Sequence, residues 1–100
     1  MILTFREATE SDLPLLVAML ADDKLGALRE DASSPMNQRY LAAFNSIASD
    51  PNNELIVVES EKQLAGMLQL TFIPYLTYIG SWRCLIEGVR IHKNLSLIHI

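Results

Sequence analysis

The chain has 100 residues, of which half are hydrophobic and a fifth are charged, and this composition is typical of one folded domain rather than a disordered or fibrous protein. The net charge is −4 at pH 7 and the eight Lys and Arg residues are scattered, so nucleic acid is not an expected partner. One cysteine and two histidines exclude an internal disulfide and give no credible metal site.

The apolar segment at residues 13–21 is too short to span a bilayer, and its flanks are acidic. The first six residues lack the basic region and cleavage signal of an exported protein. We therefore expect no membrane insertion and no export. A reducing, cytoplasmic setting fits the single cysteine.

Residues 2–6 are expected to form a short strand, and a helix should begin in the next segment, Thr9-Glu10-Ser11-Asp12. This segment supplies an N-cap with an acidic residue three positions on, and Pro14 is tolerated in the first helical turn if Ser11 rather than Thr9 is the cap. The buried stripe of this helix has the spacing i, i+3, i+4, i+7 and consists of Leu13, Leu16, Val17 and Leu20.

Residues 25–33 are mixed in character and are expected to form a charged loop. A second helix is predicted from Ser34-Pro35, which has a capping residue followed by proline at the first helical position. Asp50-Pro51 should end this helix, because the residue before a proline is disfavoured in helical conformation. Its expected buried face is made by Leu41, Phe44 and Ile47.

Residues 55–58 are apolar on both sides of the pleat, which predicts an interior strand covered on both faces. Residues 60–62 should form a tight turn into a second strand at 63–73, so the two strands form an antiparallel hairpin that ends at Pro74. Alternate apolar residues of the second strand are expected on one face: Leu64, Gly66, Leu68, Leu70 and Phe72.

A last strand is predicted at residues 82–93, with Leu85, Glu87, Val89 and Ile91 on one face and with Cys84, Ile86, Gly88, Arg90 and His92 on the other. The element order is therefore one strand, two helices and three strands (β-α-α-β-β-β). This order predicts an α/β fold of the α+β kind, with a mostly antiparallel sheet.

Three segments in this order resemble the N-terminal part of the GNAT superfamily of N-acetyltransferases: Arg6-Glu7-Ala8-Thr9 with Asp12-Leu13, then Leu64-Ala65-Gly66-Met67-Leu68, then Ile86-Glu87-Gly88-Val89-Arg90-Ile91-His92. The resemblance covers residues 1–93 and implies an incomplete GNAT-like acyl-CoA N-acyltransferase domain. In that superfamily the strand leads into an Arg/Gln-x-x-Gly-x-Gly/Ala loop that binds pyrophosphate. Residues 94–100 do not match this loop, and we expect them to be a tail unrelated to the family.

The resemblance implies that acetyl-CoA is the co-substrate and that its pantetheine arm binds along the last strand. The implied cofactor-binding groups are the backbone groups of Val89, Arg90 and Ile91, because an amide-bearing arm can satisfy open groups of a strand. The implied reaction is transfer of an acetyl group to a primary amine of a small molecule or peptide, whose identity the sequence does not specify. The chain by itself is expected to be inactive, because the pyrophosphate loop is missing.

Glu87 is the candidate general base, because a carboxylate in the middle of an apolar strand is costly to bury without a partner or a task. The alternative is a carboxylate that points into solvent or pairs with Arg83 or Arg90. His92 is a second candidate for the same role, and its alternative is an ordinary exposed imidazole.

Three further residues are considered for the site. Tyr75 and Tyr78 either line the acceptor pocket or cover the sheet edge with aromatic area. Cys84 is expected to be a small buried apolar residue rather than a nucleophile, because the sequence places no activating base beside it. Residues 25–34 correspond to the loop that often shapes the acceptor site in the superfamily, although a solvated loop explains them equally.

Two other functions remain open. The chain is either a non-catalytic fragment or small α/β binding module, or a complete small α/β domain of unrelated function. An incomplete sheet also exposes the apolar edge of the last strand at Val89 and Ile91, and this edge predicts self-association or marginal stability.

Overall fold

The computed structural model describes residues 2–92. The elements are β1 (Leu3–Glu7), the 3₁₀ turn η1 (Glu10–Asp12), α1 (Leu13–Leu20), α2 (Lys24–Arg29), α3 (Gln38–Ser49), β2 (Asn53–Ser60), β3 (Gln63–Pro74), α4 (Thr77–Gly80) and β4 (Trp82–Ile91). The expected order is confirmed, with two short helices, α2 and α4, added to it. The tail at residues 94–100 lies outside the described residues.

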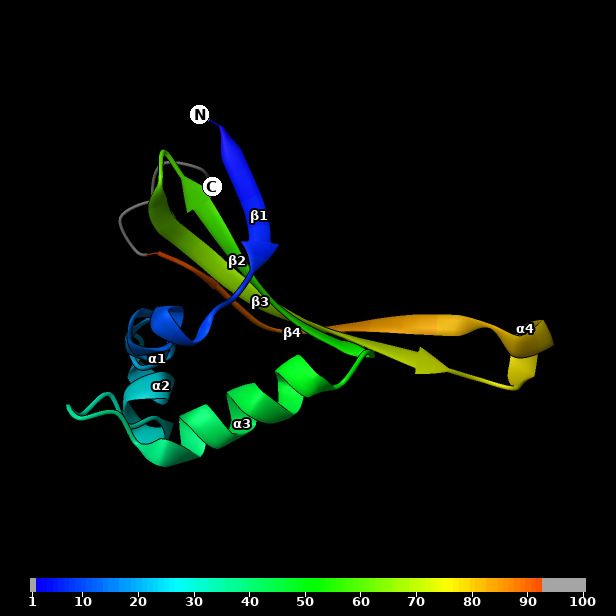
Figure 1. The fold of residues 1–100 in the computed structure, drawn as a ribbon, viewed down its shortest axis with the longest axis horizontal. Helices are drawn as coiled ribbons and strands as arrows, with labels where there is room; N and C mark the ends of the chain where they lie inside the picture. Colours follow the sequence, from blue (N-terminus) through cyan, green and yellow to red (C-terminus); the bar gives the residue numbers. More distant parts are fainter. Residues whose placement is uncertain (1, 93–100) are drawn as a thin grey trace.

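The four strands form one antiparallel sheet in the order β1-β2-β3-β4, so the expected α+β fold is confirmed. Helices α1, α2 and α3 lie on one side of the sheet (Figure 1). The far half of the β3–β4 hairpin extends beyond β1 and β2 as an arm that carries α4 at its tip (Figure 1).

The entry into α1 is fixed by Arg6. Its Nη1 and Nη2 atoms donate to the two carboxylate oxygens of Asp12 at 2.8 and 2.9 Å, and its Nε donates to Glu59 of β2 at 2.8 Å. The Asp12 carboxylate also accepts the backbone N–H of Thr9 at 2.7 Å. The bidentate hydrogen bonds from Arg6, and then those from Thr9, hold the pKa of Asp12 well below its ordinary value.

Of the two capping residues considered, Thr9 is the N-cap of the first turn and Ser11 is not. The reason is the short 3₁₀ turn that precedes α1, because Thr9 and Asp12 form a capping box around it. Pro14 still lies in the first turn of α1, where its missing N–H leaves no hydrogen bond unmade.

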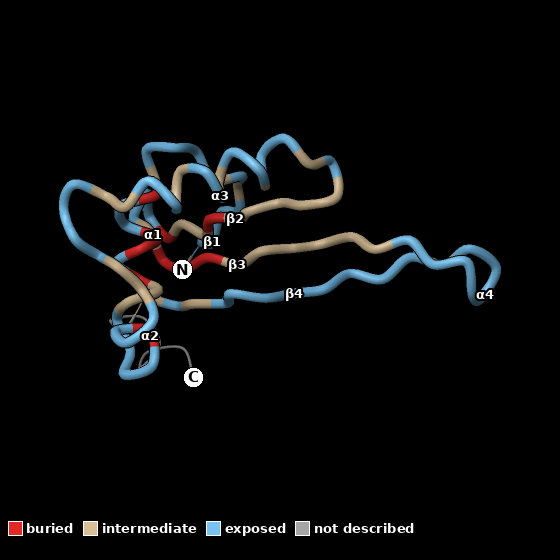
Figure 2. Tube along the Cα trace, turned by 90° about the horizontal axis from the view of Figure 1, so that it is seen from below, coloured by how far each residue is buried: buried red, intermediate tan, exposed pale blue. Residues whose placement is uncertain are grey.

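The core lies between α1 and the middle of the sheet, where the buried segments gather in Figure 2. Val57 of β2 is completely buried, and Met67 of β3 lies opposite it in the register. Three residues of the predicted α1 stripe are buried, namely Leu13, Leu16 and Val17. Met19 is buried beside them, and Leu20, the fourth residue of the stripe, is half-buried. The predicted face of α3 is half-buried, with Leu41 and Phe44 against the core.

Two boundaries differ from the expectation. Helix α3 begins at Gln38 rather than at Ser34-Pro35, because the side chain of Asn37 caps it by accepting the N–H of Arg39 at 2.9 Å. The segment expected as a loop from residue 25 contains helix α2, whose first turn is capped by Asp23. Gly26 permits this helix to approach α1, since a Cβ there would lie 1.9 Å from the carbonyl oxygen of Leu20.

The β2–β3 hairpin is confirmed, and its turn uses positive φ angles at Glu61 and Lys62. The register shifts between Val58 and Glu59 of β2, so β3 has one extra residue there, which is Ala65. This bulge moves Leu64 to the α1 side, where it packs against the core. The expectation that Leu64 shares a face with Gly66 and Leu68 was therefore wrong.

The opposite face of the sheet is not covered by residues 2–92. It forms an apolar hollow of about 500 Å³, with Leu3, Phe5, Val58, Leu68, Val89 and Ile91 among the residues that line it. Strand β2 lies between two other strands, as expected. Within the described residues, only the face of β2 that is turned toward the helices is covered. None of the helices described here is long and apolar enough to span a membrane.

The Arg6–Asp12 pair gives a prediction for stability. Asp12→Asn should lower the unfolding free energy by about 1–3 kcal/mol, because it removes the charge-assisted bonds to Arg6 and weakens the cap. Because the folded pKa of Asp12 lies below its ordinary 3.8, the pair stabilises the protein above about pH 4 and is lost as pH falls further. The variant should therefore be less sensitive to acidification in that range.

Urea unfolding at pH 7 and across the acid range measures both effects. Glu10→Gln is the matched control, because it removes one exposed carboxylate from the same turn. Equal losses in the two variants would show that net charge, and not the Arg6–Asp12 pair, is responsible.

Candidate functional site

Strand β4 has β3 on one edge and no other strand beside it within the described residues. Its pairing is interrupted: Gln69 pairs with Glu87 and Met67 pairs with Arg90, so three steps along β4 match two along β3. The extra residue forms a β-bulge at Gly88, which has φ +62°. The bulge lies inside the segment that carries all four predicted site residues.

The bulge changes which side chains share a face. Directly paired residues of antiparallel strands project to the same face, so Glu87 and Arg90 both lie on the side of Met67 and Gln69. Val89 and Ile91 line the hollow on the opposite face. The predicted alternation, with Glu87 beside Val89 and Ile91, was wrong beyond Gly88.

Glu87 is exposed. The two arginines considered as its partners are engaged elsewhere, since the Arg83 guanidinium lies 4.6 Å from the centre of the Tyr75 ring and Arg90 faces Asp23. Within residues 2–92 the Glu87 carboxylate makes no hydrogen bond or ion pair. It is an open proton acceptor on the edge strand.

Arg90 connects β4 to the helical layer. Its Nε lies 3.7 Å from the carboxylate of Asp23, and its Nη1 donates to the carbonyl oxygen of Val89 at 2.9 Å. The Nε is buried and has no hydrogen-bond partner within the described residues. The carbonyl of Val89, one of the expected pantetheine-binding groups, therefore already accepts a hydrogen bond from the neighbouring side chain.

Gly66 sets the spacing between β3 and β4 beside the bulge. A Cβ at this position would lie 2.7 Å from the carbonyl oxygen of Arg90, which is closer than real Cβ contacts allow. In the sequence, Gly66 is recognisable only as part of a motif. The structure gives a steric reason for glycine at this position, which is the close approach of the β3 and β4 backbones.

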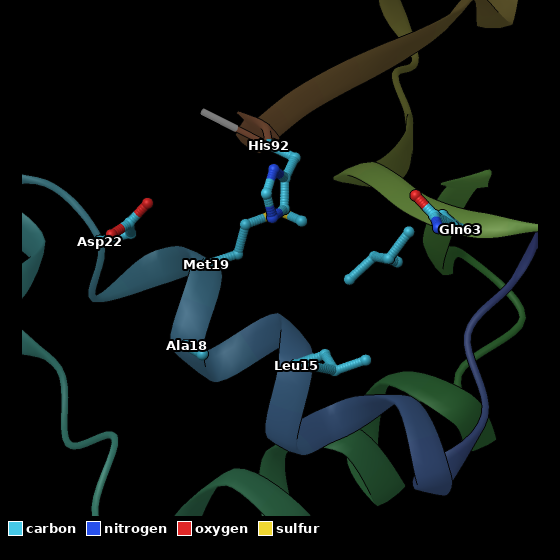
Figure 3. A pocket seen from close by; sticks show the side chains of 7 residues that line it. Leu15, Ala18, Met19, Asp22, Gln63 and His92 are labelled. Atoms are coloured by element: carbon cyan, nitrogen blue, oxygen red, sulfur yellow. The ribbon is translucent and has the colours of Figure 1, made fainter. Parts of the chain in front are cut away.

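His92 follows β4, and its backbone N–H donates to the carbonyl of Ala65 at 2.7 Å. Its imidazole lies over α1 near Met19, with Asp22 and Gln63 to either side (Figure 3). These side chains line a hollow of about 410 Å³ that is separate from the open edge at Glu87. No group of three or more metal-ligating side chains occurs within residues 2–92.

The other candidates lie on the arm. Cys84 is exposed, so the expectation of a buried cysteine was wrong, because this half of β4 extends past the helices that could cover it. Tyr75 stacks on Arg83 and Tyr78 is 80% exposed at the tip. Neither tyrosine lies beside Glu87. Both follow the last strand pair, Pro74 with Trp82, whereas Glu87 pairs with Gln69 further back along the hairpin.

Solved structures match this arrangement. The protein called a transcriptional regulator from Bacillus halodurans C-125 is 54% identical, with a TM-score of 0.88 over 94% of this chain and 63% of that one. The glucosamine-6-phosphate N-acetyltransferase from Arabidopsis thaliana is 15% identical, with a TM-score of 0.70 over 95% of this chain and 63% of that one. A predicted acetyltransferase from Clostridium acetobutylicum, solved with acetyl-CoA, is 17% identical, with a TM-score of 0.62 over 93% and 62%.

Neither a protein-family model nor a curated protein matches the chain. The structural matches define the class: the four-stranded antiparallel sheet with helices on one side is an acetyltransferase fold. More specifically, the chain has the fold of the GNAT superfamily, and the resemblance seen in its sequence is confirmed. The chain spans less than two thirds of the length of these structures.

The bulge gives a prediction for β4. Gly88→Ala should lower the unfolding free energy by about 1–2 kcal/mol, because a Cβ is strained at this positive φ although no atom lies within 4 Å of its position. Gly80→Ala is the matched control, with φ +67° and the same open space at the tip of the arm. Amide chemical shifts of Glu87–Ile91 should move only for Gly88→Ala, and unchanged shifts would show that the bulge tolerates a side chain.

Proposed function

We propose that this chain supplies the N-terminal part of an acetyl-CoA-dependent N-acetyltransferase, which transfers an acetyl group to a primary amine. The observation that carries the proposal is the bulge at Gly88, on an edge strand with no further neighbour in the described part of the chain. The bulge interrupts the regular ladder beside Glu87. An exposed edge also leaves backbone groups available to a ligand.

In this proposal the pantetheine arm lies along Val89, Arg90 and Ile91 and binds their backbone groups as another strand would. The likeness to an acetyltransferase solved with acetyl-CoA supports this choice of co-substrate. The carbonyl oxygen of Val89 has two lone pairs, so it can accept a pantetheine amide N–H while it keeps the hydrogen bond from Arg90. Arg90 is held on the other side by Asp23.

Glu87 acts as the general base. Its carboxylate takes a proton from the acceptor ammonium, directly or through a water molecule, and the freed amine attacks the thioester carbon. A backbone N–H of β4 stabilises the oxyanion while the new C–N bond forms. The C–S bond then breaks, and coenzyme A leaves as a thiolate that takes up the second proton, which the attacking nitrogen loses as it becomes an amide. The exposed position of Glu87 supports this role, because an acceptor can reach it.

The proposed acceptor is the amine of a small molecule or a peptide. Amines are cationic at neutral pH, and the net charge of −4 favours their approach to the protein. A cytoplasmic setting is part of the proposal, because the exposed thiol of Cys84 stays reduced there.

Coenzyme A should bind the 100-residue chain weakly. The sequence after Lys93 contains no glycine, so the pyrophosphate loop of the superfamily is missing from it. Loss of charge-assisted hydrogen bonds at about 1.5–3 kcal/mol each removes at least ~4 kcal/mol, which is roughly a thousandfold in affinity. Calorimetric titration should show this difference between the chain and a chimera in which the matching C-terminal part of the Bacillus halodurans protein follows Lys93.

Equal affinity of the chain and the chimera would contradict the proposed site, because it would show that the pyrophosphate contacts are not needed. The melting curve of the chimera is the control, since a cooperative transition shows that the joined halves fold together.

The same chimera tests the base. Glu87→Gln keeps the shape and removes the proton acceptor, so turnover of acetyl-CoA with an amine panel should fall by about a hundredfold to ten-thousandfold. Coenzyme A affinity should change little. Glu61→Gln in the β2–β3 turn is the matched control and should leave turnover unaltered. Unchanged turnover in Glu87→Gln would remove Glu87 from the site.

A second candidate is a non-catalytic regulatory module, and the name of the 54% identical protein favours it. The acidic composition disfavours direct contact with DNA. Fluorescence anisotropy with duplex DNA tests this candidate. Salt-sensitive binding, together with no acetyl transfer by the folded chimera, would replace the enzymatic proposal.

A further inference from the structure

The tip of the β3–β4 arm carries an apolar surface that the acetyltransferase proposal does not use. The pairing of β3 with β2 ends at Thr71, and beyond it the hairpin continues with β4 as its single described neighbour. Figure 2 shows β4 and the tip exposed, whereas β3 is of intermediate burial as far as Ile73. The arm-tip surface consists of Leu76, Tyr78, Ile79 and Trp82.

These side chains are far more exposed than large apolar groups usually are. Leu76 is 95% exposed, Tyr78 is 80% exposed and Ile79 is fully exposed. Their neighbours offer almost no charge, since residues 68–86 contain a single charged side chain, Arg83, and its guanidinium stacks on Tyr75. Contiguous apolar surface of this kind marks an interaction site in a soluble protein.

The backbone of the tip is well defined although its side chains face solvent. The N–H of Tyr75 donates to the carbonyl of Ser81 at 2.8 Å, and the N–H of Gly80 donates to the carbonyl of Leu76 at 3.1 Å. Within this closed turn Tyr78 and Ile79 have φ values of +52° and +59°. A left-handed conformation is strained for a β-branched residue such as Ile79, and strain of this kind is concentrated at functional sites.

We propose that two copies of this chain associate through their arm-tip surfaces. The four side chains expose roughly 700 Å² per copy, taking about 200 Å² for each large side chain in full exposure. Two such surfaces bury about 1,400 Å² in total, which lies within the range of standard specific interfaces. The surface lacks charged side chains that would select a partner of opposite charge. Two copies related by a twofold axis bring the same apolar surface together from both sides.

This assignment differs from the expectation of self-association through Val89 and Ile91. Those two residues lie at the bulge, and the arm-tip surface lies at the far end of the same hairpin. The interface therefore leaves the open edge of β4 at Glu87 accessible.

Sedimentation equilibrium combined with tryptophan emission tests the proposal on the 100-residue chain. Trp82 is the only tryptophan and is 61% exposed, so its emission reports on the arm tip. The mass should rise from monomer to dimer with concentration, and the emission should shift to shorter wavelength over the same range. Ile79→Ser should weaken the association at least tenfold, because the change removes a side chain from both copies.

Two variants act as controls. Leu28→Ser removes another highly exposed apolar side chain, from α2, and should leave the association unchanged. Ile79→Gly relieves the left-handed strain, so it should raise the melting temperature while it weakens association, which separates the interface from folding. A chain that stays monomeric, a dimer with unshifted Trp82 emission, or equal weakening by Leu28→Ser or Ile91→Ser would overturn the proposal.

Discussion

The bidentate pair between Arg6 and Asp12 holds the layers of this fold together. It joins the end of β1 to the first turn before α1, and a further bond from Arg6 to Glu59 adds β2. The direction in which α1 leaves the sheet is set at this point. Leu13 and Leu16 reach Val57 from that direction, so the only extensive buried core in residues 2–92 depends on a polar contact at its margin.

The fold was largely predictable because its strands and helices have clear periodicity. The sequence motif formed by Arg6, Thr9 and Asp12 was read as a family signature, and the structure gives it a physical reason, since the three groups bind one another. The choice of cap between Thr9 and Ser11 was left open. Sequence patterns register that a capping residue is present, whereas the choice between neighbouring residues depends on tertiary partners such as Arg6.

The faces assigned to the candidate site residues were wrong beyond Gly88, and the roles given to these residues remain predictions. A period of two assigns every residue of a strand to a face, and one bulge inverts that assignment for all the residues beyond it. Gly88 was the available signal, because glycine inside a strand often marks a bulge. The contacts of Arg90 with Asp23 and with Val89 could not have been foreseen, since they join segments far apart in the chain or depend on one rotamer.

The close approach of β3 and β4 at Gly66 has a consequence for how the site can vary. Strand β3 contributes no chemical group to the proposed reaction. Because glycine has no side chain, however, Gly66 allows the backbone of Arg90 to lie close to β3. Positions that carry no functional atom can thus be as restricted as the base itself. A library that randomised only Glu87, Val89, Arg90 and Ile91 would overlook the residue across the ladder that keeps their backbone in place.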